Sequence, residues 1–148
     1  MDLQPKKSYY EPSHTAEHIL NQTMVRMFGC ERSKNAHIER KKSKCDYNLS
    51  TEPTADQLKE VEAKVNEVIA MNLPVTTRML SRAELPESID LSKLPADAGQ
   101  ELRIVSIGDY DHCACIGDHV DNTSEIGTFV MLTTDYAEGR LRMRWKIK

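Results

Sequence analysis

Two stretches of the chain carry apolar residues at the three- and four-residue spacing of an amphipathic helix. The first runs from residue 12 or 13 to residue 28 and is followed by Gly29, a residue type that commonly ends helices. The second begins at Thr54 and Gln57, which have the spacing of a capping box, and ends near residue 72. The sequence therefore predicts two main helices.

The remaining apolar pattern is that of β-strands. Residues 140–148 alternate strictly, so that Leu141, Met143 and Trp145 face one way and basic residues face the other. Further strands are predicted at residues 75–80, 102–107 and 128–134, and a hairpin of two irregular strands within 33–48. Residues 81–100 contain two prolines and little periodicity, so we expect a connecting region there with at most one short helix. We therefore expect an α+β fold in which two helices pack on one face of an antiparallel sheet.

Composition and charge narrow the class of protein only a little. The 148 residues are 39% hydrophobic and 29% charged, which is ordinary for one globular domain spanning residues 1–148. No apolar run approaches the length that spans a bilayer, and the N-terminus lacks the apolar stretch of a signal peptide. Four cysteines in such a chain are more often free or metal-bound than paired, so we expect a cytoplasmic protein without a membrane partner. The net charge of −3 neither indicates nor excludes a nucleic-acid partner.

His14 and His18 lie four residues apart on the first predicted helix. Their imidazoles therefore project from one face, one turn apart, and can bind a single ion. At about 100° per residue, the apolar stripe of this helix centres near Ala16 and Leu20, on the side opposite to the two histidines. The histidines are therefore not expected to pack with that stripe. They face either solvent or a space formed with another part of the chain.

The segment from Cys115 to His119 supplies two more ligands, in a turn that contains Gly117 and follows a strand. Thiolate and imidazole are the ligand types that select zinc, and three nitrogen donors with one sulfur donor make an acceptable tetrahedral shell. We therefore predict one zinc site with four ligands: His14, His18, Cys115 and His119. Cys113 and His112 are nearby alternatives, because Cys113 and Cys115 share a side if the segment is extended.

Two paired motifs carry a resemblance to a known family. They read His14-Thr15-Ala16-Glu17-His18-Ile19-Leu20 and Cys115-x-x-x-His119-Val120-x-x-Thr123-x-Glu125-Ile126-Gly127. Between them lie Val61-x-x-x-Val65-Asn66-x-x-Ile69 and Arg103-Ile104-Val105. With these motifs the chain resembles the editing domain shared by alanyl- and threonyl-tRNA synthetases. The resemblance extends from about Tyr10 to Lys148. The chain resembles more closely the free-standing AlaX trans-editing proteins, in their short form.

The resemblance implies zinc-dependent hydrolysis of a mischarged aminoacyl-tRNA, typically seryl- or glycyl-tRNA(Ala). Such an ester needs an activated water and a stabilised oxyanion, and zinc can supply both. His14, His18 and Cys115 are the expected catalytic residues. Asp118 is expected to act as a partner of the ligands or a general base, or else to cap the loop. Because four protein ligands close a tetrahedral shell, one ligand binds loosely, the ion becomes five-coordinate, or the ion mainly holds the substrate amino group.

The chain departs from the family at positions expected to meet the amino acid. The family loop usually reads Cys-Gly-Gly-Thr-His, and a glycine there lets the backbone approach the substrate, whereas Ile116 adds a branched side chain. Relatives often carry a Gln-Lys-Gly-Ser-like stretch where this chain has Lys34-Asn35-Ala36-His37. The expected substrate-binding residues are Lys34, His37, Ile116 and Gly117.

Basic residues around the predicted hairpin are the expected tRNA contacts: Arg32, Arg40, Lys41, Lys42 and Lys44. Such residues neutralise backbone phosphates without reading the base sequence. The basic face of residues 140–148 is a second candidate surface. Two other functions also fit the sequence. One is a related zinc hydrolase that acts on another small ester or amide. The other is a non-catalytic zinc-binding module.

Overall fold

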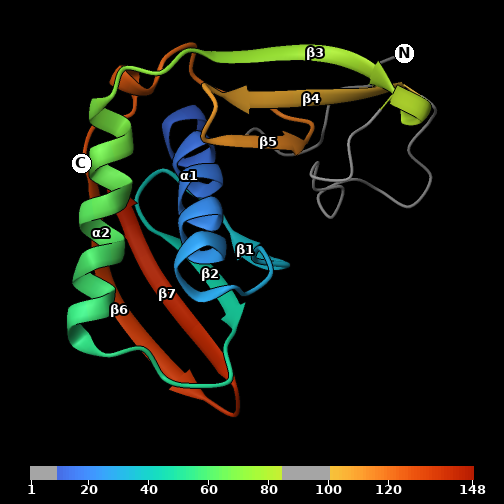
Figure 1. Ribbon diagram of the computed structural model, residues 1–148. Helices are drawn as coiled ribbons and strands as arrows, with labels where there is room; N and C mark the ends of the chain where they lie inside the picture. Colours follow the sequence, from blue (N-terminus) through green and yellow to red (C-terminus); the bar gives the residue numbers. More distant parts are fainter. Residues whose placement is uncertain (1–9, 85–100) are drawn as a thin grey trace.

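The computed structural model describes residues 10–84 and 101–148. Its long helices are α1 (Glu11–Phe28) and α2 (Ala55–Ala70), and its single-turn helices are η1 (Arg82–Glu84) and η2 (Thr123–Glu125). The strands are β1 (Asn35–His37), β2 (Ser43–Asn48), β3 (Val75–Ser81), β4 (Glu101–Ile107), β5 (Asp111–Ala114), β6 (Phe129–Ala137) and β7 (Arg140–Ile147). The α+β class with antiparallel strands and two main helices is therefore confirmed (Figure 1). Most of the connecting region expected at 81–100 lies outside the described residues.

The strands form two antiparallel sheets where the sequence led us to expect one. One sheet has the order β1-β2-β7-β6 and the other the order β3-β4-β5. The hairpin expected within residues 33–48 is present as β1 and β2, and β2 pairs with β7 along its whole length. Pairing of β2 with β7 joins segments far apart in the chain, so the pattern of either segment alone does not reveal it.

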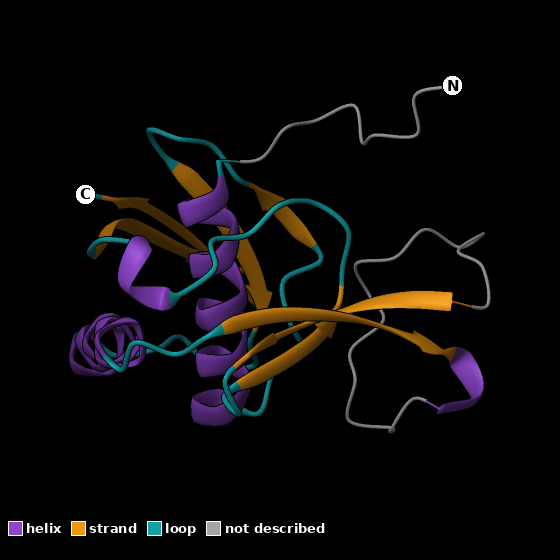
Figure 2. Ribbon diagram, turned by 90° about the horizontal axis from the view of Figure 1, so that it is seen from above, coloured by secondary structure: helices purple, strands orange, loops and turns teal. Residues whose placement is uncertain are grey.

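Helix α1 lies between the two sheets and beside α2 (Figures 1 and 2). It contacts β5 of the smaller sheet and β7 of the larger one. Every residue from Ser13 to Asn21 is consequently buried, although the apolar stripe covers only one side of the helix. The helix ends at Gly29, which has φ 68° and whose amide donates to the Val25 carbonyl, as in a left-handed C-cap. Polar side chains on the other sides of α1 therefore face protein.

Helix α2 is joined to the edge strand β6 by side-chain hydrogen bonds. The Asn66 amide donates to the Phe129 carbonyl over 2.9 Å and accepts from the Phe129 amide over 2.8 Å. The Glu62 carboxylate accepts from the Met131 amide over 2.7 Å. At the start of the helix the predicted capping box is confirmed, with Thr54 at the N-cap. In the part of the chain that the structure describes, neither long helix is apolar enough to cross a membrane.

Candidate metal centre

Four side chains from two distant segments meet beside the buried part of α1: His14, His18, Cys115 and His119. Their ligand atoms all lie within 4.8 Å of one another. The rings of His14 and His119 stack with centroids 4.0 Å apart, and the ring of His18 meets both edge-on. His14 and His18 thus face a space formed with the loop after β5, which is one of the two arrangements that the sequence allows. The set of side chains predicted as zinc ligands is brought together.

Protein partners hold the Nδ1 atoms of two of these rings. His14 Nδ1 lies 2.9 Å from the main-chain carbonyl oxygen of Asp118. Because a carbonyl only accepts, this nitrogen donates, and the other ring nitrogen, Nε2, lies 3.5 Å from Cys115 Sγ. His119 Nδ1 lies 2.9 Å from the Thr15 hydroxyl, which also accepts from the Val120 amide. The helix residue between the two histidines therefore positions the fourth ligand.

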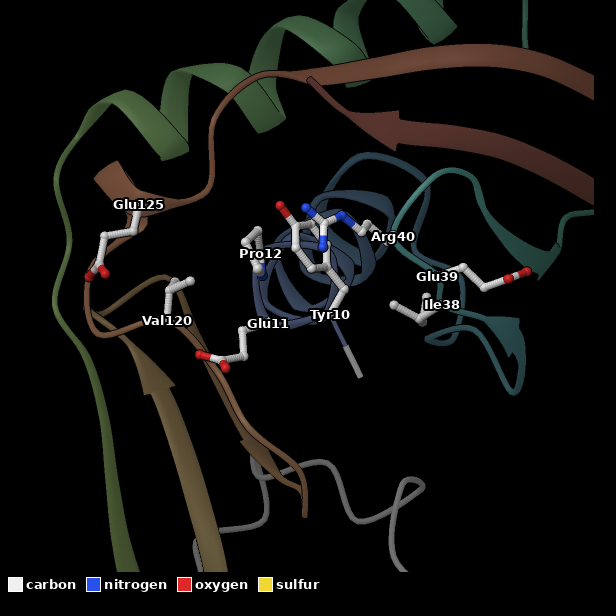
Figure 3. A pocket seen from close by; sticks show the side chains of 8 residues that line it. All are labelled: Tyr10, Glu11, Pro12, Ile38, Glu39, Arg40, Val120 and Glu125. Carbon is white, nitrogen blue, oxygen red and sulfur yellow. The ribbon is translucent and has the colours of Figure 1, made fainter. Parts of the chain in front are cut away.

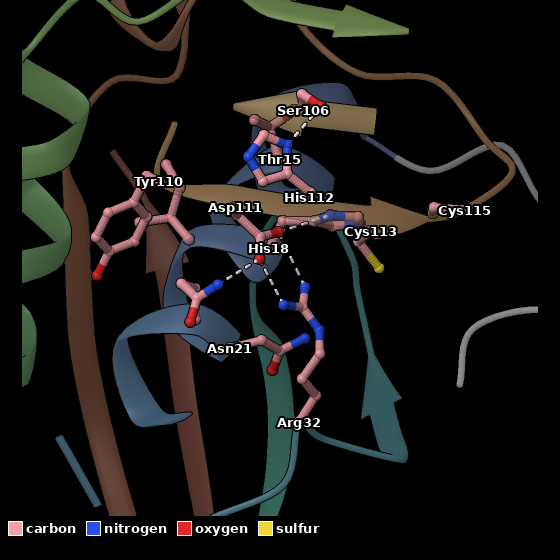
Figure 4. A network of polar contacts seen from close by, with 12 residues as sticks. Thr15, His18, Asn21, Arg32, Ser106, Tyr110, Asp111, His112, Cys113 and Cys115 are labelled. Carbon is pink, nitrogen blue, oxygen red and sulfur yellow. Dashed lines mark hydrogen bonds and ion pairs between the residues drawn. The ribbon is translucent and has the colours of Figure 1, made fainter. Parts of the chain in front are cut away.

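His18 has a different partner, the buried carboxylate of Asp111 on β5 (Figure 4). His18 Nδ1 lies 3.5 Å from Asp111 Oδ2. The Arg32 guanidinium pairs with the same carboxylate through contacts of 2.6 and 3.2 Å, and Gln22 donates to it over 3.0 Å. Burial raises the pKa of Asp111, but His18 and Arg32 outweigh burial and lower it from 3.8 to about 2. The sequence did not single out Asp111.

The donor set fits a metal ion. Among the described residues, neither His18 Nε2 nor His119 Nε2 has a hydrogen-bond partner, and both atoms are buried. Burying an unpaired imidazole nitrogen is costly unless something else satisfies it. Three imidazoles and one thiolate converging on a single point match the ligands of structural and catalytic zinc sites. The cluster can therefore hold a metal ion, and a soft or borderline ion such as zinc suits it best.

Charges inside the cluster shift the ionisation of its members. Burial lowers the pKa of His18, but the Asp111 carboxylate and the Cys115 thiolate outweigh burial and raise it from 6.5 to about 9. Burial raises the pKa of Cys115, but His14 and His18 outweigh burial and lower it from 9.0 to about 6. Burial and the neighbouring histidines lower the pKa of His119 well below 6.5. Without a metal at neutral pH, a Cys115 thiolate therefore faces a protonated His18.

This arrangement predicts how zinc affinity depends on pH. To bind through Nε2, His18 must lose the proton that it keeps up to about pH 9, whereas Cys115 is already a thiolate above about pH 6. Zinc affinity is therefore expected to rise about tenfold per pH unit between about pH 7 and 9. Competition with a chelator of known affinity measures this slope, and calorimetry in two buffers counts the proton released. An affinity that stays constant over this range would contradict the assignment of His18.

The loop that carries Cys115 and His119 is held by Arg103 on β4. The Arg103 guanidinium donates to the carbonyl oxygens of Cys115 and Gly117, over 3.3 and 2.6 Å. Gly117 has φ 108°, a conformation that favours glycine, so the loop shape itself requires this residue. The Ile116 side chain is 47% exposed, and the Asp118 carboxylate is exposed, while the Asp118 carbonyl holds His14. The loop thus presents Ile116 and the Asp118 carboxylate outward.

The two alternative ligands lie outside the cluster. His112 is on β5 and its Nδ1 lies 2.8 Å from the Ser106 hydroxyl on β4. Cys113 is buried in the hydrophobic core, and within the described ranges the group of converging ligands does not include it. The choice of Cys115 over Cys113 therefore agrees with the geometry.

The expected tRNA contacts need one correction. Arg32 is 7% exposed and bound to Asp111, so it is not available to phosphate, and assigning it to the RNA surface was wrong. Arg40, Lys41 and Lys42 are exposed in the turn between β1 and β2, and Lys44 is half-buried. The predicted substrate residues Lys34 and His37 are exposed, and they pair with Glu31 over 2.9 Å and with Glu39 over 2.7 Å.

A hollow of about 670 Å³ lies at the start of α1, and its lining includes none of the four converging ligands (Figure 3). Its wall includes Glu11 and Pro12, one helical turn before His14, and Val120, the residue after His119. Arg40 and other residues of the β1–β2 turn form the opposite wall, and the Arg40 guanidinium lies 5.2 Å from the centre of the Tyr10 ring. The volume is in the range that accommodates small-molecule ligands.

The fold and the cluster together define this chain as an α+β protein with a group of side chains that can bind a metal ion. Residues 102–143 match the family model described as the threonyl and alanyl tRNA synthetase second additional domain. Over 121 residues, 80% of this chain, it is 34% identical to the alanine–tRNA ligase of Methylacidiphilum infernorum. The alanine–tRNA ligase of Methanocella arvoryzae is 34% identical over 138 residues, 90% of the chain, and that of Streptococcus suis is 32% identical over 123 residues, 82% of the chain.

These matches span only 13%, 16% and 14% of the three ligases. The family match contains Cys115 and His119, and the longer matches extend over most of the chain. The resemblance predicted from the sequence is therefore confirmed, and this chain is a relative of the additional domain that threonyl- and alanyl-tRNA synthetases share.

Proposed function

We propose that this chain hydrolyses mischarged aminoacyl-tRNA, seryl- or glycyl-tRNA(Ala), with a zinc ion as cofactor and as a protein separate from the synthetase. The observation that carries the proposal is the convergence of His14, His18, Cys115 and His119 in a relative of alanine–tRNA ligases. We place the reaction in the cytoplasm, where aminoacyl-tRNA is made. The residues 1–148 would act as one domain.

The chemistry of the cluster suits an ester. A zinc ion bound there supplies an acidified water and polarises the ester carbonyl. The protein holds its ligands by contacts from Asp118, Asp111 and Thr15, so that little reorganisation accompanies the reaction. The Asp118 carboxylate lies on the same loop as two ligands and is the candidate base. Since it is exposed, it would have to turn toward the ligands to accept a proton from a water there.

The hollow at the start of α1, whose lining includes Val120 directly after His119, offers room for the esterified end of the tRNA. We assign its amino-acid end to Ile116 and Gly117 of the loop, together with Lys34 and His37 near the β1–β2 turn. Exposed Arg40, which lines the hollow, continues into Lys41 and Lys42, where backbone phosphates would be neutralised.

The basic face of β7 is a weaker candidate for RNA contact. Arg142 pairs with Asp46 over 2.9 Å and Arg144 with Asp135 over 2.7 Å. Both charges are partly neutralised within the protein, so we assign tRNA contact to the β1–β2 turn instead.

A panel of mischarged tRNAs tests the proposal. Zinc-loaded protein is expected to release serine or glycine from tRNA(Ala) well above the spontaneous rate, with zinc content measured on the same sample. Cognate alanyl-tRNA(Ala) serves as the comparison substrate. Hydrolysis of small esters alone would support a different hydrolase. A zinc-loaded protein that hydrolyses nothing, and unfolds when a chelator removes the ion, would instead be a structural zinc module.

A further inference from the structure

The buried group formed by Gln22, Arg32 and Asp111 belongs neither to the ligand set nor to the RNA surface. Asp111 is 1% exposed and Arg32 is 7% exposed, so this is a fully enclosed ion pair. Removing a guanidinium and a carboxylate from water is costly, and hydrophobic residues often stabilise a fold equally well. A buried pair next to a metal ligand therefore calls for a role beyond stability.

The contacts divide unequally between the two carboxylate oxygens. Oδ1 of Asp111 accepts from Arg32 Nη1 over 2.6 Å and from Gln22 over 3.0 Å. Oδ2 accepts from Arg32 Nη2 over 3.2 Å and lies 3.5 Å from His18 Nδ1. One oxygen is thus fixed by the two shortest contacts, and the other is left facing the ring of His18 (Figure 4).

We infer that Asp111 is a positioning residue that keeps the proton of neutral His18 on Nδ1, and that Arg32 orients Asp111 for this task. Arg32 and Gln22 only donate to the carboxylate, so the oxygen toward His18 must accept, and the ring nitrogen facing it must donate. Nε2 of His18 is then the atom with the lone pair. Both ring nitrogens are buried without a hydrogen bond among the described residues, but Nδ1 lies 3.5 Å from the Asp111 carboxylate, whereas Nε2 faces away from that carboxylate. A carboxylate behind a metal-bound histidine is a general way to fix ring orientation and raise ligand basicity.

The inference rests on the proposed metal, and Asp111→Asn tests it. In this variant the amide oxygen is drawn to the Oδ1 position, where Arg32 and Gln22 both require an acceptor. The amide nitrogen then faces His18 Nδ1 as a donor and favours the tautomer with the proton on Nε2, which cannot bind metal. Zinc affinity, measured by chelator competition, is expected to fall about 10- to 100-fold. Asp109→Asn, an exposed carboxylate in the turn before β5, is the matched control and should leave the affinity unchanged.

A double variant separates positioning from mere structural support. In Arg32→Met with Asp111→Asn, the guanidinium no longer holds the amide oxygen, so the amide can turn and accept from His18. Zinc affinity is expected to recover toward the wild-type value. If the pair only supports the fold, the double variant should bind zinc no better than Asp111→Asn, and that result would overturn the inference.

Nitrogen-15 spectra of zinc-loaded wild-type protein test the same point without any substitution. We expect zinc on Nε2 of His18 and a proton on Nδ1. Zinc on Nδ1 would overturn the inference, even if Asp111→Asn fails to fold. If the wild type binds no zinc, the proposed function fails and the inference falls with it. If the wild type binds zinc and Asp111→Asn binds it equally tightly, only the inference fails.

Discussion

Replacing Cys115 by alanine is expected to lower zinc affinity by more than about 100-fold and to abolish the deacylation that we propose. This loss exceeds the loss of about 10- to 100-fold expected when a residue that only contacts a ligand is removed. The thiolate is the one anionic ligand in the cluster, and its pKa of about 6 makes it available at neutral pH. Without it, three imidazoles face the ion with no compensating negative charge. Chelator competition measures the affinity, and the cobalt-loaded protein should lose its sulfur-to-metal charge-transfer band.

Cys113→Ala is the matched control for this variant. Cys113 lies two residues away and is also buried, but it is not among the four side chains whose ligand atoms converge in the described structure. The same substitution there should leave zinc affinity and the cobalt spectrum unchanged. His112→Ala offers a second control, because His112 contacts the Ser106 hydroxyl on β4 and is not among the converging ligands of the described structure. Equal losses from Cys115→Ala and Cys113→Ala would contradict the ligand assignment.

Local features of the fold could be predicted from the sequence because their causes are local. The end of α1 at Gly29 and the capping box at Thr54 depend on residues within one turn of each helix end. The alternation in β7 likewise reports which face is buried, and Leu141, Met143 and Trp145 are all buried. Division of the strands into two sheets was missed because it depends on which strands pair, and pairing partners can lie anywhere in the chain.

The site, like the fold, has features that could be predicted from the sequence and others that could not. The ligands were predictable, since histidine and cysteine at fixed spacings have few other uses in such a pattern. The residues that hold the ligands were not predictable, because each acts through a contact with another segment. Thr15 and His119 are 104 residues apart, Arg32 and Asp111 are 79 apart, and Arg103 on β4 reaches Gly117, 14 residues further along, only because of the loop shape.

Arg32 shows the error most clearly. In the sequence it stands beside other basic residues and looks like part of a phosphate-binding surface, yet the fold turns it inward to Asp111. One signal was available: Asp111 and Cys113 alternate on a strand whose next residues bear the ligands, so an acidic side chain at a buried position was foreseeable.

Replacing Trp145 by alanine is expected to lower the free energy of unfolding of the metal-free protein by about 3–5 kcal/mol. Trp145 is fully buried on β7 and its ring lies 5.3 Å from that of Phe129, which Asn66 of α2 holds in place. The substitution therefore opens a cavity where α2 and the larger sheet meet. Urea unfolding followed by circular dichroism measures the change, because the variant has no tryptophan left to report by fluorescence.

Two further variants serve as controls for this prediction. Arg140→Ala, on the exposed side of β7, should change stability by no more than about 0.5 kcal/mol. Trp145→Phe should cost less than Trp145→Ala, because the ring is largely kept and the buried Nε1, which has no hydrogen-bond partner among the described residues, is removed. A loss below about 1 kcal/mol for Trp145→Ala would contradict the packing. Zinc affinity of the folded variant should stay unchanged, because Trp145 contributes no ligand and none of the contacts that hold the ligands, so stability and metal binding can be varied separately.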